Sequence, residues 1–247
     1  MSGGPPPPAP GGAGPASGNR RTQLIVLGVL AALILIAAIV ISQSGSDDSG
    51  GGEPSSDDTA AVESALEGIP QDGVFLGDDG APVVTEFVDL QCPFCAEFST
   101  RAFNDVVEEH VRPGEILYEL RVISFLGQDS GKAAELAAAA ALQNRLYEFT
   151  ETFYLNQGEE NSGYVTEEFL TEIAEKTPGL DAEQALADRS SPEAQDLIAE
   201  NEDRATALNV NSTPTFLLTG GAEPTPLNLT DLTPEAFSEA LAAAQSG

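Results

Sequence analysis

The 247-residue sequence has few basic residues. It contains 10 lysines and arginines against 40 aspartates and glutamates, which gives a formal net charge of −30 at pH 7. All 40 acidic residues follow residue 41, together with eight of the ten basic ones. A surface this negative repels phosphate groups, which argues against nucleic acid and anionic lipid as partners of this part of the chain. Its self-repulsion is best tolerated where salt screens it.

Residues that bind metals are equally scarce. The chain has one histidine, His110, and two cysteines, Cys92 and Cys95, which belong to a single Cys-Pro-Phe-Cys motif. A zinc site built on these two cysteines would need two further ligands. The sequence therefore predicts no metal site and implies no organic cofactor. We interpret His110 as a residue near the end of a helix, not as a catalytic one.

The two cysteines follow a short apolar segment. Residues 83–95 read VVTEFVDLQCPFC, and their β-branched and aromatic residues favour a buried strand ahead of the cysteines. Pro93 fits the first position of a helix, which puts Cys92 at the N-cap. A thiolate there faces free backbone N–H groups and the positive end of the helix dipole. Cys92 is thus predicted to have a lowered pKa and to be the attacking sulfur, with Cys95 as its resolving partner.

A strand, a Cys-x-x-Cys pair and a helix in this order are typical of a thioredoxin active site. Through EFVDLQCPFC and the later NSTPTFLLTG, the chain from residue 73 onward resembles the DsbA-like thiol–disulfide oxidoreductases of the thioredoxin superfamily. The resemblance implies that Pro214 is the family's cis-proline and that the backbone of Thr213 pairs with a client strand. We expect this cis bond to lie against Cys92, and Phe94 to offer clients an apolar contact. The family's usual central dipeptide is Pro-His, so Phe94 removes one stabiliser of the thiolate.

Composition divides the N-terminal part of the chain into three segments. Residues 1–22, rich in Gly, Pro, Ala and Ser, are predicted to form a disordered cytoplasmic tail. Residues 24–41 carry no charge and no proline and would span about 27 Å as a helix, so 23–42 is the predicted transmembrane anchor. Basic residues before it and acidic residues after it place the rest of the chain outside the cell. Residues 43–60 are the predicted flexible acidic linker, and a cleaved signal peptide is the competing interpretation of the apolar segment.

Residues 61–247 are predicted to form one α/β domain, a DsbA-like thioredoxin fold. Helical patterns predict about four helices over residues 129–208, inserted between the second and third strands, and the resemblance implies the same insertion. The other predicted elements are a helical turn over 62–67, a short strand over 74–76, a helix over 93–111, a strand over 116–125, a hairpin of 215–219 with 225–229, and a last helix from Thr233.

Two features of the predicted insertion are specific enough to check. An apolar stripe places Leu142 and Leu146 on one face of a single helix that begins in the alanine-rich run 133–141 and continues to Phe153. The sequences Thr-Glu-Glu at 166–168 and Ser-Pro-Glu at 191–193 signal helix starts, each with an N-cap oxygen ahead of acidic residues.

Two acidic residues lie close to the cysteines in the sequence. Glu86 precedes Cys92 by six residues and lies on the same side of the predicted strand. Burial of its carboxylate is costly, so its pKa is predicted to rise, and it could then exchange protons with the resolving thiol through water. The resemblance implies an acid at this place; the alternative is that Glu86 points to solvent. Asp89, nearer the loop, is expected to be exposed.

The leading hypothesis is a membrane-anchored thiol–disulfide oxidoreductase that acts on cysteine-containing client proteins outside the cytoplasm and is recycled by a membrane redox partner. Two alternatives stay open. The same chemistry can run in reverse, in a disulfide reductase or isomerase. The chain can also be a non-catalytic tethered binding module in which the two cysteines form a structural disulfide. Cysteines three residues apart close a loop too small to restrict the unfolded chain much, which argues against the last alternative.

Overall fold

The structure is a computed structural model, and it describes residues 56–221 and 223–246. The predicted cytoplasmic tail and transmembrane anchor lie outside the described residues, as does most of the predicted linker. Within the described ranges, no helix is both long enough and apolar enough to cross a membrane.

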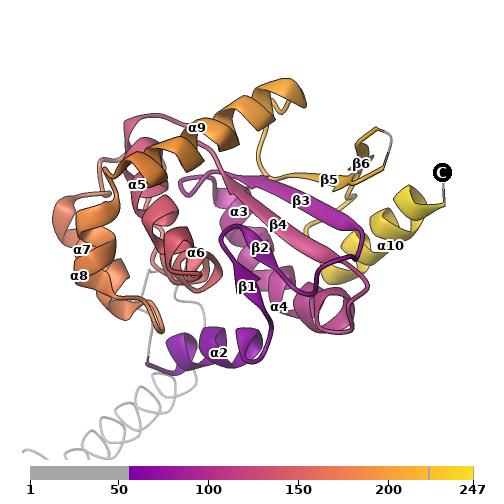
Figure 1. Cartoon of the computed structure of the whole chain (residues 1–247), viewed down its shortest axis with the longest axis horizontal. Helices are drawn as coiled ribbons and strands as arrows, with labels where there is room; N and C mark the ends of the chain where they lie inside the picture. The colour runs from indigo at the N-terminus through magenta and orange to yellow at the C-terminus, as the bar shows by residue number, and fades with distance from the viewer. Residues whose placement is uncertain (1–55, 222, 247) are drawn as a thin grey trace, which may run out of the picture. The chain divides into compact units, whose positions relative to one another are not determined.

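A six-stranded mixed sheet, in the order β1-β2-β4-β3-β5-β6, forms the centre of the described part (Figure 1). Its strands are β1 (Gln71–Asp72), β2 (Phe75–Leu76), β3 (Val83–Val88), β4 (Leu117–Val122), β5 (Thr215–Thr219) and β6 (Thr225–Leu227). β3 pairs in parallel with β4 and antiparallel with β5, so it is a central strand. Five of its six residues are buried, as expected for a strand covered on both faces.

The sheet differs from the prediction at its edges. β1 was not predicted, because two paired residues are too few to produce a recognisable alternation. β4 ends at Val122, three residues before the predicted end. The backbone N–H of Ser124 donates to Glu202, and those of Phe125 and Leu126 donate to Asp89, so side chains take the place of a strand partner.

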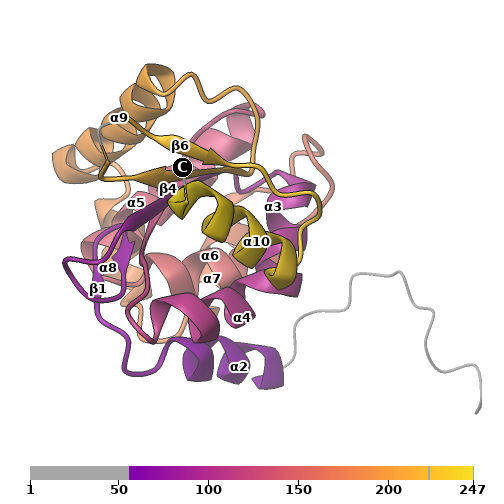
Figure 2. The same ribbon diagram turned by 90° about the vertical axis from the view of Figure 1, so that its right-hand side faces the viewer.

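One long helical segment follows β3, over the predicted range 93–111. It consists of α3 (Pro93–Phe98), the π-helical turn η1 (Ser99–Phe103), α4 (Asn104–Val106) and the π-helical turn η2 (Val107–Val111). This segment and α10 (Pro234–Gln245) lie on one side of the sheet, and α9 (Pro192–Ala207) lies on the other (Figure 2). Phe98, Phe216 of β5 and Phe237 of α10 pack together and join the segment to the sheet.

The insertion between β4 and β5 has five helices among the described residues, one more than predicted. They are α5 (Gln128–Leu142), α6 (Leu146–Leu155), α7 (Glu167–Lys176), α8 (Ala182–Asp188) and α9. The helices α5 to α8 lie beside one end of the sheet (Figure 1). The predicted caps at Thr166, Ser191 and Thr233 are confirmed, because each side chain accepts a hydrogen bond from a backbone N–H in the first turn.

The prediction of a single helix through Leu142 and Phe153 is wrong. The chain breaks between α5 and α6, where Asn144 adopts a left-handed conformation with φ of 57°. Asparagine tolerates this conformation, and its Oδ1 accepts a hydrogen bond from the backbone N–H of Gly73 at 2.8 Å. Leu142 is therefore 46 % exposed, whereas Phe149 and Phe153 are buried in the core.

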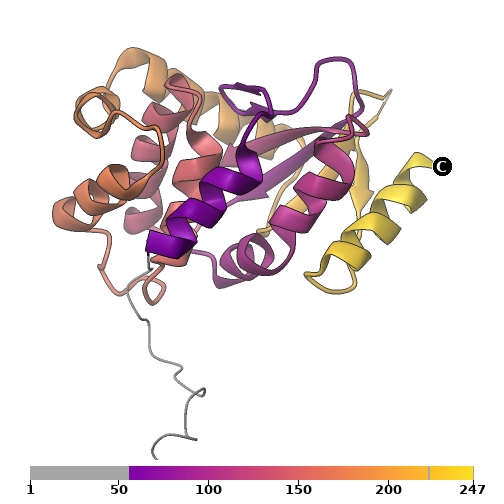
Figure 3. The same cartoon turned by 90° about the horizontal axis from the view of Figure 1, so that it is seen from below.

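The first described helix, α2 (Ser56–Leu66), starts before the predicted end of the linker at residue 60. Figure 3 shows α2, the helical segment 93–111 and α10 side by side. The guanidinium of Arg112 donates to the carbonyl oxygens of Ala65 and Glu67 at 2.8 and 3.0 Å. These bonds satisfy carbonyl groups that a helix end leaves without partners, so they fasten α2 to the domain.

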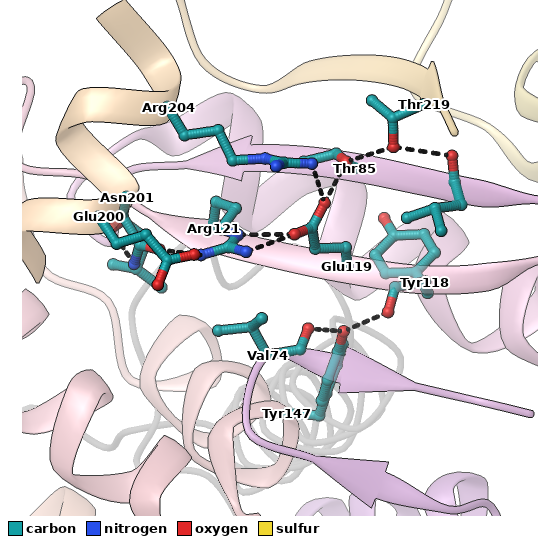
Figure 4. A network of polar contacts seen from close by, with 12 residues as sticks. Val74, Thr85, Tyr118, Glu119, Arg121, Tyr147, Glu200, Asn201, Arg204 and Thr219 are labelled. Carbon is teal, nitrogen blue, oxygen red and sulfur yellow. Dashed lines mark hydrogen bonds and ion pairs between the residues drawn. The ribbon is translucent and has the colours of Figure 1, made fainter. Parts of the chain in front are cut away.

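A buried ion cluster joins α9 to its side of the sheet (Figure 4). Glu119 of β4 is 1 % exposed and pairs with Arg121 at 2.5 Å and with Arg204 of α9 at 2.9 Å. Arg121 also pairs with Glu200, and the hydroxyl of Thr85 donates to Glu119. The carboxylate is thus compensated by two guanidinium groups, which is the arrangement that a buried charge requires.

Candidate active site

Cys92 and Cys95 lie at the start of α3, just beyond the end of β3. Cys92 is the N-cap residue, with an extended backbone (φ −71°, ψ 119°), and Pro93 occupies the first turn. A proline there costs no hydrogen bond, because the first N–H groups of a helix have no partner inside it. Both cysteines are thiols in this structure and both are buried.

The two thiols differ in acidity. The hydrogen bond with the Cys95 thiol is the largest cause that lowers the pKa of Cys92 to about 6. Burial opposes it, and the side chain of Thr213 and the backbone N–H groups of Phe94 and Cys95 add to it. The pKa of Cys95 is raised well above its usual range, first by burial and then by the hydrogen bond and charge of Cys92. Near neutral pH, Cys92 is therefore the thiolate and Cys95 keeps its proton.

The segment before β5 lies against the first cysteine. The peptide bond between Thr213 and Pro214 is cis, as predicted from the sequence. The sulfur of Cys92 donates to the carbonyl oxygen of Thr213 at 3.3 Å, across 121 positions of sequence. The sheet brings the two together because β5 pairs directly with β3.

A groove of about 530 Å³ runs beside this pair of segments. It is lined by Phe94 and Glu97 of α3, by residues 213–216 and by residues 226–232. The Phe94 side chain lines this groove and is 60 % exposed. An exposed apolar side chain beside a groove is typical of a surface that binds another molecule. Thr213, Pro214 and Phe94 thus line one groove, and Thr213 also contacts the sulfur of Cys92.

Glu86 lies on the inner side of β3, 4 % exposed, and not in solvent. Burial is the main cause that raises its pKa to about 8, and the charges of Glu151 and Cys92 act in the same direction. The Tyr118 hydroxyl donates to its Oε2 at 2.8 Å and acts against the rise. Glu86 and Cys95 line the same small cavity. The acid is therefore protonated near neutral pH and lies next to the resolving thiol.

Comparison with known proteins identifies the fold. Residues 70–242 match the family model described as Thioredoxin. The chain belongs to the thioredoxin family. It is 33 % identical over 149 residues to a protein of Bacillus anthracis named "Probable disulfide bond formation protein D", across 59 % of this chain and 69 % of the relative. The protein of the same name from Bacillus cereus is 31 % identical over the same shares of the two chains.

Solved structures show the same fold. Oxidised BdbD from Bacillus subtilis superposes with a TM-score of 0.60 at 20 % identity, over 81 % of this chain and all of that one. DsbA from Chlamydia trachomatis superposes with a TM-score of 0.57 at 20 % identity, over 70 % of this chain and 90 % of that one. These structures establish a thioredoxin-like fold with a helical insertion. The chain is a DsbA-like member of the thioredoxin family and a protein thiol–disulfide oxidoreductase.

Asp89 is buried, so the prediction that it is exposed is wrong. Its exposed fraction is 0 %, and one carboxylate oxygen accepts hydrogen bonds from the backbone N–H groups of Phe125 and Leu126. The other accepts from the hydroxyl of Ser130 and the backbone N–H of Gln91. Four donors compensate the loss of water around the carboxylate, and all but Gln91 come from segments distant in sequence.

The insertion also holds the backbone of the loop that carries Cys92. The hydroxyl of Tyr154 donates to the carbonyl oxygen of Asp89 at 3.2 Å. The amide of Gln157 donates to the carbonyl oxygens of Leu90 and Cys92 at 2.8 and 3.2 Å. Helix α6 and the segment after it therefore fix the position of the cysteine loop.

Sequence reasoning missed one acidic residue of this region, Glu151 of α6. It is 8 % exposed, burial raises its pKa to about 7, and the Ser99 hydroxyl donates to its Oε1 at 2.8 Å. Its sequence signal is its spacing from Tyr147 and Tyr154, at i+4 and i+7 of one helix face, where both tyrosines are buried.

No group of three or more His, Cys, Asp or Glu side chains in the described ranges is arranged to hold a metal ion.

Proposed function

We propose that this protein is a membrane-anchored thiol–disulfide oxidoreductase that works outside the cytoplasm. It exchanges disulfides with secreted or surface client proteins through Cys92 and Cys95. The difference in acidity between these two thiols is the observation that carries the proposal. A structural disulfide has no need of one ionised and one protonated sulfur at a groove, whereas thiol exchange depends on that difference.

The exchange begins with the disulfide form of the pair. A client thiolate attacks the sulfur of Cys92, the bond to Cys95 breaks, and Cys95 leaves with the electron pair and takes up a proton. The client is then joined to Cys92 by a mixed disulfide. A second client thiolate attacks the client sulfur of that bond, and Cys92 leaves as a thiolate. The client is oxidised to a disulfide and the pair is reduced by two electrons.

The groove provides a place for the client during these steps. The backbone of Thr213 lies beside the sulfur of Cys92 and pairs with an extended client segment. The exposed ring of Phe94 contributes apolar contact at the same surface, next to Pro214.

Oxidation of clients is the direction that the acidity of Cys92 favours. A low pKa stabilises the thiolate of the reduced pair, which makes the disulfide form a stronger oxidant. The two Bacillus relatives are named as probable disulfide bond formation proteins, and forming a disulfide is an oxidation of the client. A membrane redox partner then has to take up two electrons from the reduced pair. The apolar residues 24–41, preceded by basic and followed by acidic residues, support the anchor and its orientation.

Two cysteine variants of the full-length protein test the proposal in intact cells. Cys95→Ser should accumulate mixed disulfides with clients, because Cys92 still attacks but has no resolving partner. Cys92→Ser should form no mixed disulfides and lose thiol exchange. The adducts should stay in carbonate-washed membranes and be degraded by protease added outside the cells. Equal behaviour of the two variants would contradict the mechanism, and adducts in the soluble fraction would contradict the anchor.

A further inference from the structure

The amide of Gln157, in the segment that follows α6, contacts the cysteine loop from the side of the insertion. Its Nε2 donates to the carbonyl oxygen of Leu90 at 2.8 Å and to that of Cys92 at 3.2 Å. Carbonyl oxygens only accept hydrogen bonds, so the NH2 group of this amide, and not its oxygen, faces them. One side chain of the insertion therefore holds two carbonyl groups of the loop, and one of them belongs to the attacking cysteine.

The carbonyl group of Cys92 has two partners. Besides Gln157, it accepts the first hydrogen bond of the helical segment 93–111, from the backbone N–H of Ala96 at 3.2 Å. A carbonyl oxygen has two lone pairs, so both of its acceptor positions are used. These bonds restrain rotation about the Cα–C bond of Cys92, whose ψ of 119° gives the extended backbone that is typical of an N-cap residue.

This backbone conformation decides what the sulfur of Cys92 can reach. An extended N-cap residue brings its side chain to the N–H groups of the second and third helical residues, which have no partner inside the helix. Here these residues are Phe94 and Cys95, and their backbone N–H groups favour the thiolate of Cys92. The thiolate thus depends on a torsion angle that Gln157 restrains.

Gln157 is itself held in place by the insertion. At the next position, Gly158 packs against the ring of Tyr164 so closely that a Cβ atom on this glycine would lie 2.6 Å from the ring. That ring packs in turn on the rings of Phe153 and Phe169. Packing therefore fixes the position of the amide independently of the cysteine loop.

We propose that Gln157 is a positioning residue for thiol exchange: its amide fixes the carbonyl group of Cys92 and so keeps the sulfur beside the helix N–H groups that stabilise a thiolate. The restraint acts on the reduced form, because in the disulfide form the covalent bond to Cys95 holds Cys92 in place. Gln157 thus stabilises the reduced pair relative to the disulfide. A pair whose reduced form is stabilised is a stronger oxidant, so one amide of the insertion makes the centre more oxidising.

This inference rests on the proposed function, since it explains part of the acidity on which thiol exchange depends. Gln157→Met tests it, because methionine keeps the length of the side chain and loses both N–H donors. Asn156→Leu is the matched control. Asn156 is the neighbouring amide and is also half-buried, but its Nδ2 donates to the carbonyl oxygen of Thr152 in α6 and not to the cysteine loop.

Tyr154→Phe is a second control, which loosens the cysteine loop at a different point. It removes the hydroxyl that donates to the carbonyl oxygen of Asp89 and leaves the partners of the Cys92 carbonyl unchanged. The comparison therefore separates a general loosening of the loop from the loss of the contact with Cys92.

The first measurement is the titration of the Cys92 thiolate by its ultraviolet absorbance in the reduced full chain, with the disulfide form as the blank. The wild-type midpoint should lie near the pKa of about 6. Gln157→Met should raise the midpoint by roughly 0.5 to 1 pH unit, the size of one net hydrogen bond. Asn156→Leu and Tyr154→Phe should leave it in place. An unmoved midpoint in Gln157→Met, or an equal rise in Tyr154→Phe, overturns the inference.

Gln157→Glu tests the same contact with a polar side chain in place, and urea unfolding shows whether each variant is folded. An ionised carboxylate cannot donate to the two carbonyl groups, and it adds a negative charge near the thiolate. Its midpoint should therefore rise further than that of Gln157→Met. A midpoint equal to that of Asn156→Leu would contradict the inference independently of the methionine variant.

The second measurement is the equilibrium of the cysteine pair with glutathione at pH 7. In Gln157→Met the disulfide form should be a weaker oxidant, by roughly three- to fivefold in the equilibrium constant for the expected rise of the pKa. An unchanged constant would count against the restraint. Neither measurement needs a client. A protein that shows both shifts but oxidises no two-cysteine peptide would refute the proposed function alone, and an active protein without the shifts would refute this inference alone.

Discussion

The two faces of the central sheet bury acids in opposite ways. On the face toward α9, Glu119 lies between the guanidinium groups of Arg121 and Arg204. On the face toward the cysteines, Glu86 and Glu151 lie in a site without a cation among the described residues. A charge balanced by two cations holds elements together, whereas burial without a cation raises the pKa of an acid, so that the acid keeps its proton. The sheet thus separates two clusters. The structural cluster, Glu119 with Arg121 and Arg204, stabilises the fold, and the acids Glu86 and Glu151 lie near the cysteines on the other face.

The largest effect should come from removing one cation of the structural cluster. Arg121→Met leaves Glu119 buried with a single guanidinium, and breaking a buried ion pair in this way should lower the free energy of unfolding by about 3 to 5 kcal/mol. Urea unfolding at pH 7 measures the change. The pH profile of thiol exchange should stay as in the wild type, because Arg121 lies on the other face of the sheet.

Arg101→Met is the matched control for this change. Arg101 pairs with Glu97 on a helix surface, and its side chain is 48 % exposed. Exposed pairs of this kind contribute about 0.3 to 0.5 kcal/mol, so this variant should unfold almost as the wild type does. Equal losses in the two variants would show that the buried cluster has no special role in stability.

A smaller effect of opposite sign should follow from Glu86→Gln. Below pH 4.5 the carboxyl is protonated in both the folded and the unfolded protein. Above it the unfolded chain loses the proton, while the folded protein holds it up to a pKa of about 8. The wild type therefore loses stability relative to the variant as pH rises through this window, by at most about 1.4 kcal/mol per pH unit, or roughly 3 kcal/mol at pH 7.

Unfolding curves of Glu86→Gln and the wild type at pH 4.5, 6, 7 and 9 measure this difference. Glu119→Gln is the control, because it makes the same change at 1 % exposure inside the compensated cluster. It should destabilise the protein at pH 7, since two buried cations lose their common partner. A stabilising Glu119→Gln, or a destabilising Glu86→Gln at pH 9, would remove the distinction between the two faces.

The smallest effect should come from Ser99→Ala. The Ser99 hydroxyl donates to Glu151 and favours its ionised form, so its removal should raise the pKa of Glu151 above about 7. The free energy of unfolding should fall by only about 1 kcal/mol. Carboxyl NMR measures the first change and urea unfolding the second. Thr100→Ala is the control, because that hydroxyl bonds only to backbone oxygens of its own helix.

The sequence predicts the parts of this arrangement that depend on neighbouring residues. Pro93 fixes the helix start at Cys92, and Thr166 and Ser191 begin helices through contacts within one turn. The alternation of β3 places Glu86 on the side of Cys92. These features require knowledge of only a few adjacent positions, and the structure has all of them.

Features that depend on distant contacts could not be predicted in this way. Asp89 looks like a loop residue, and its burial depends on N–H donors of Phe125 and Leu126, which the folded chain brings to it. Glu151 becomes part of the site only because α6 packs against α3. The break at Asn144 depends on a hydrogen bond from Gly73, so the apolar stripe alone indicated one helix where there are two.

The insertion is not a removable module. Tyr154 and Gln157 hold the main chain of the loop that ends in Cys92, and Glu151 of the same helix faces the resolving thiol's cavity. A chain shortened to a bare strand-and-helix core would keep both cysteines and lose what positions them. Engineers who graft this redox centre onto another scaffold should therefore transfer α6 with it, as one inseparable part.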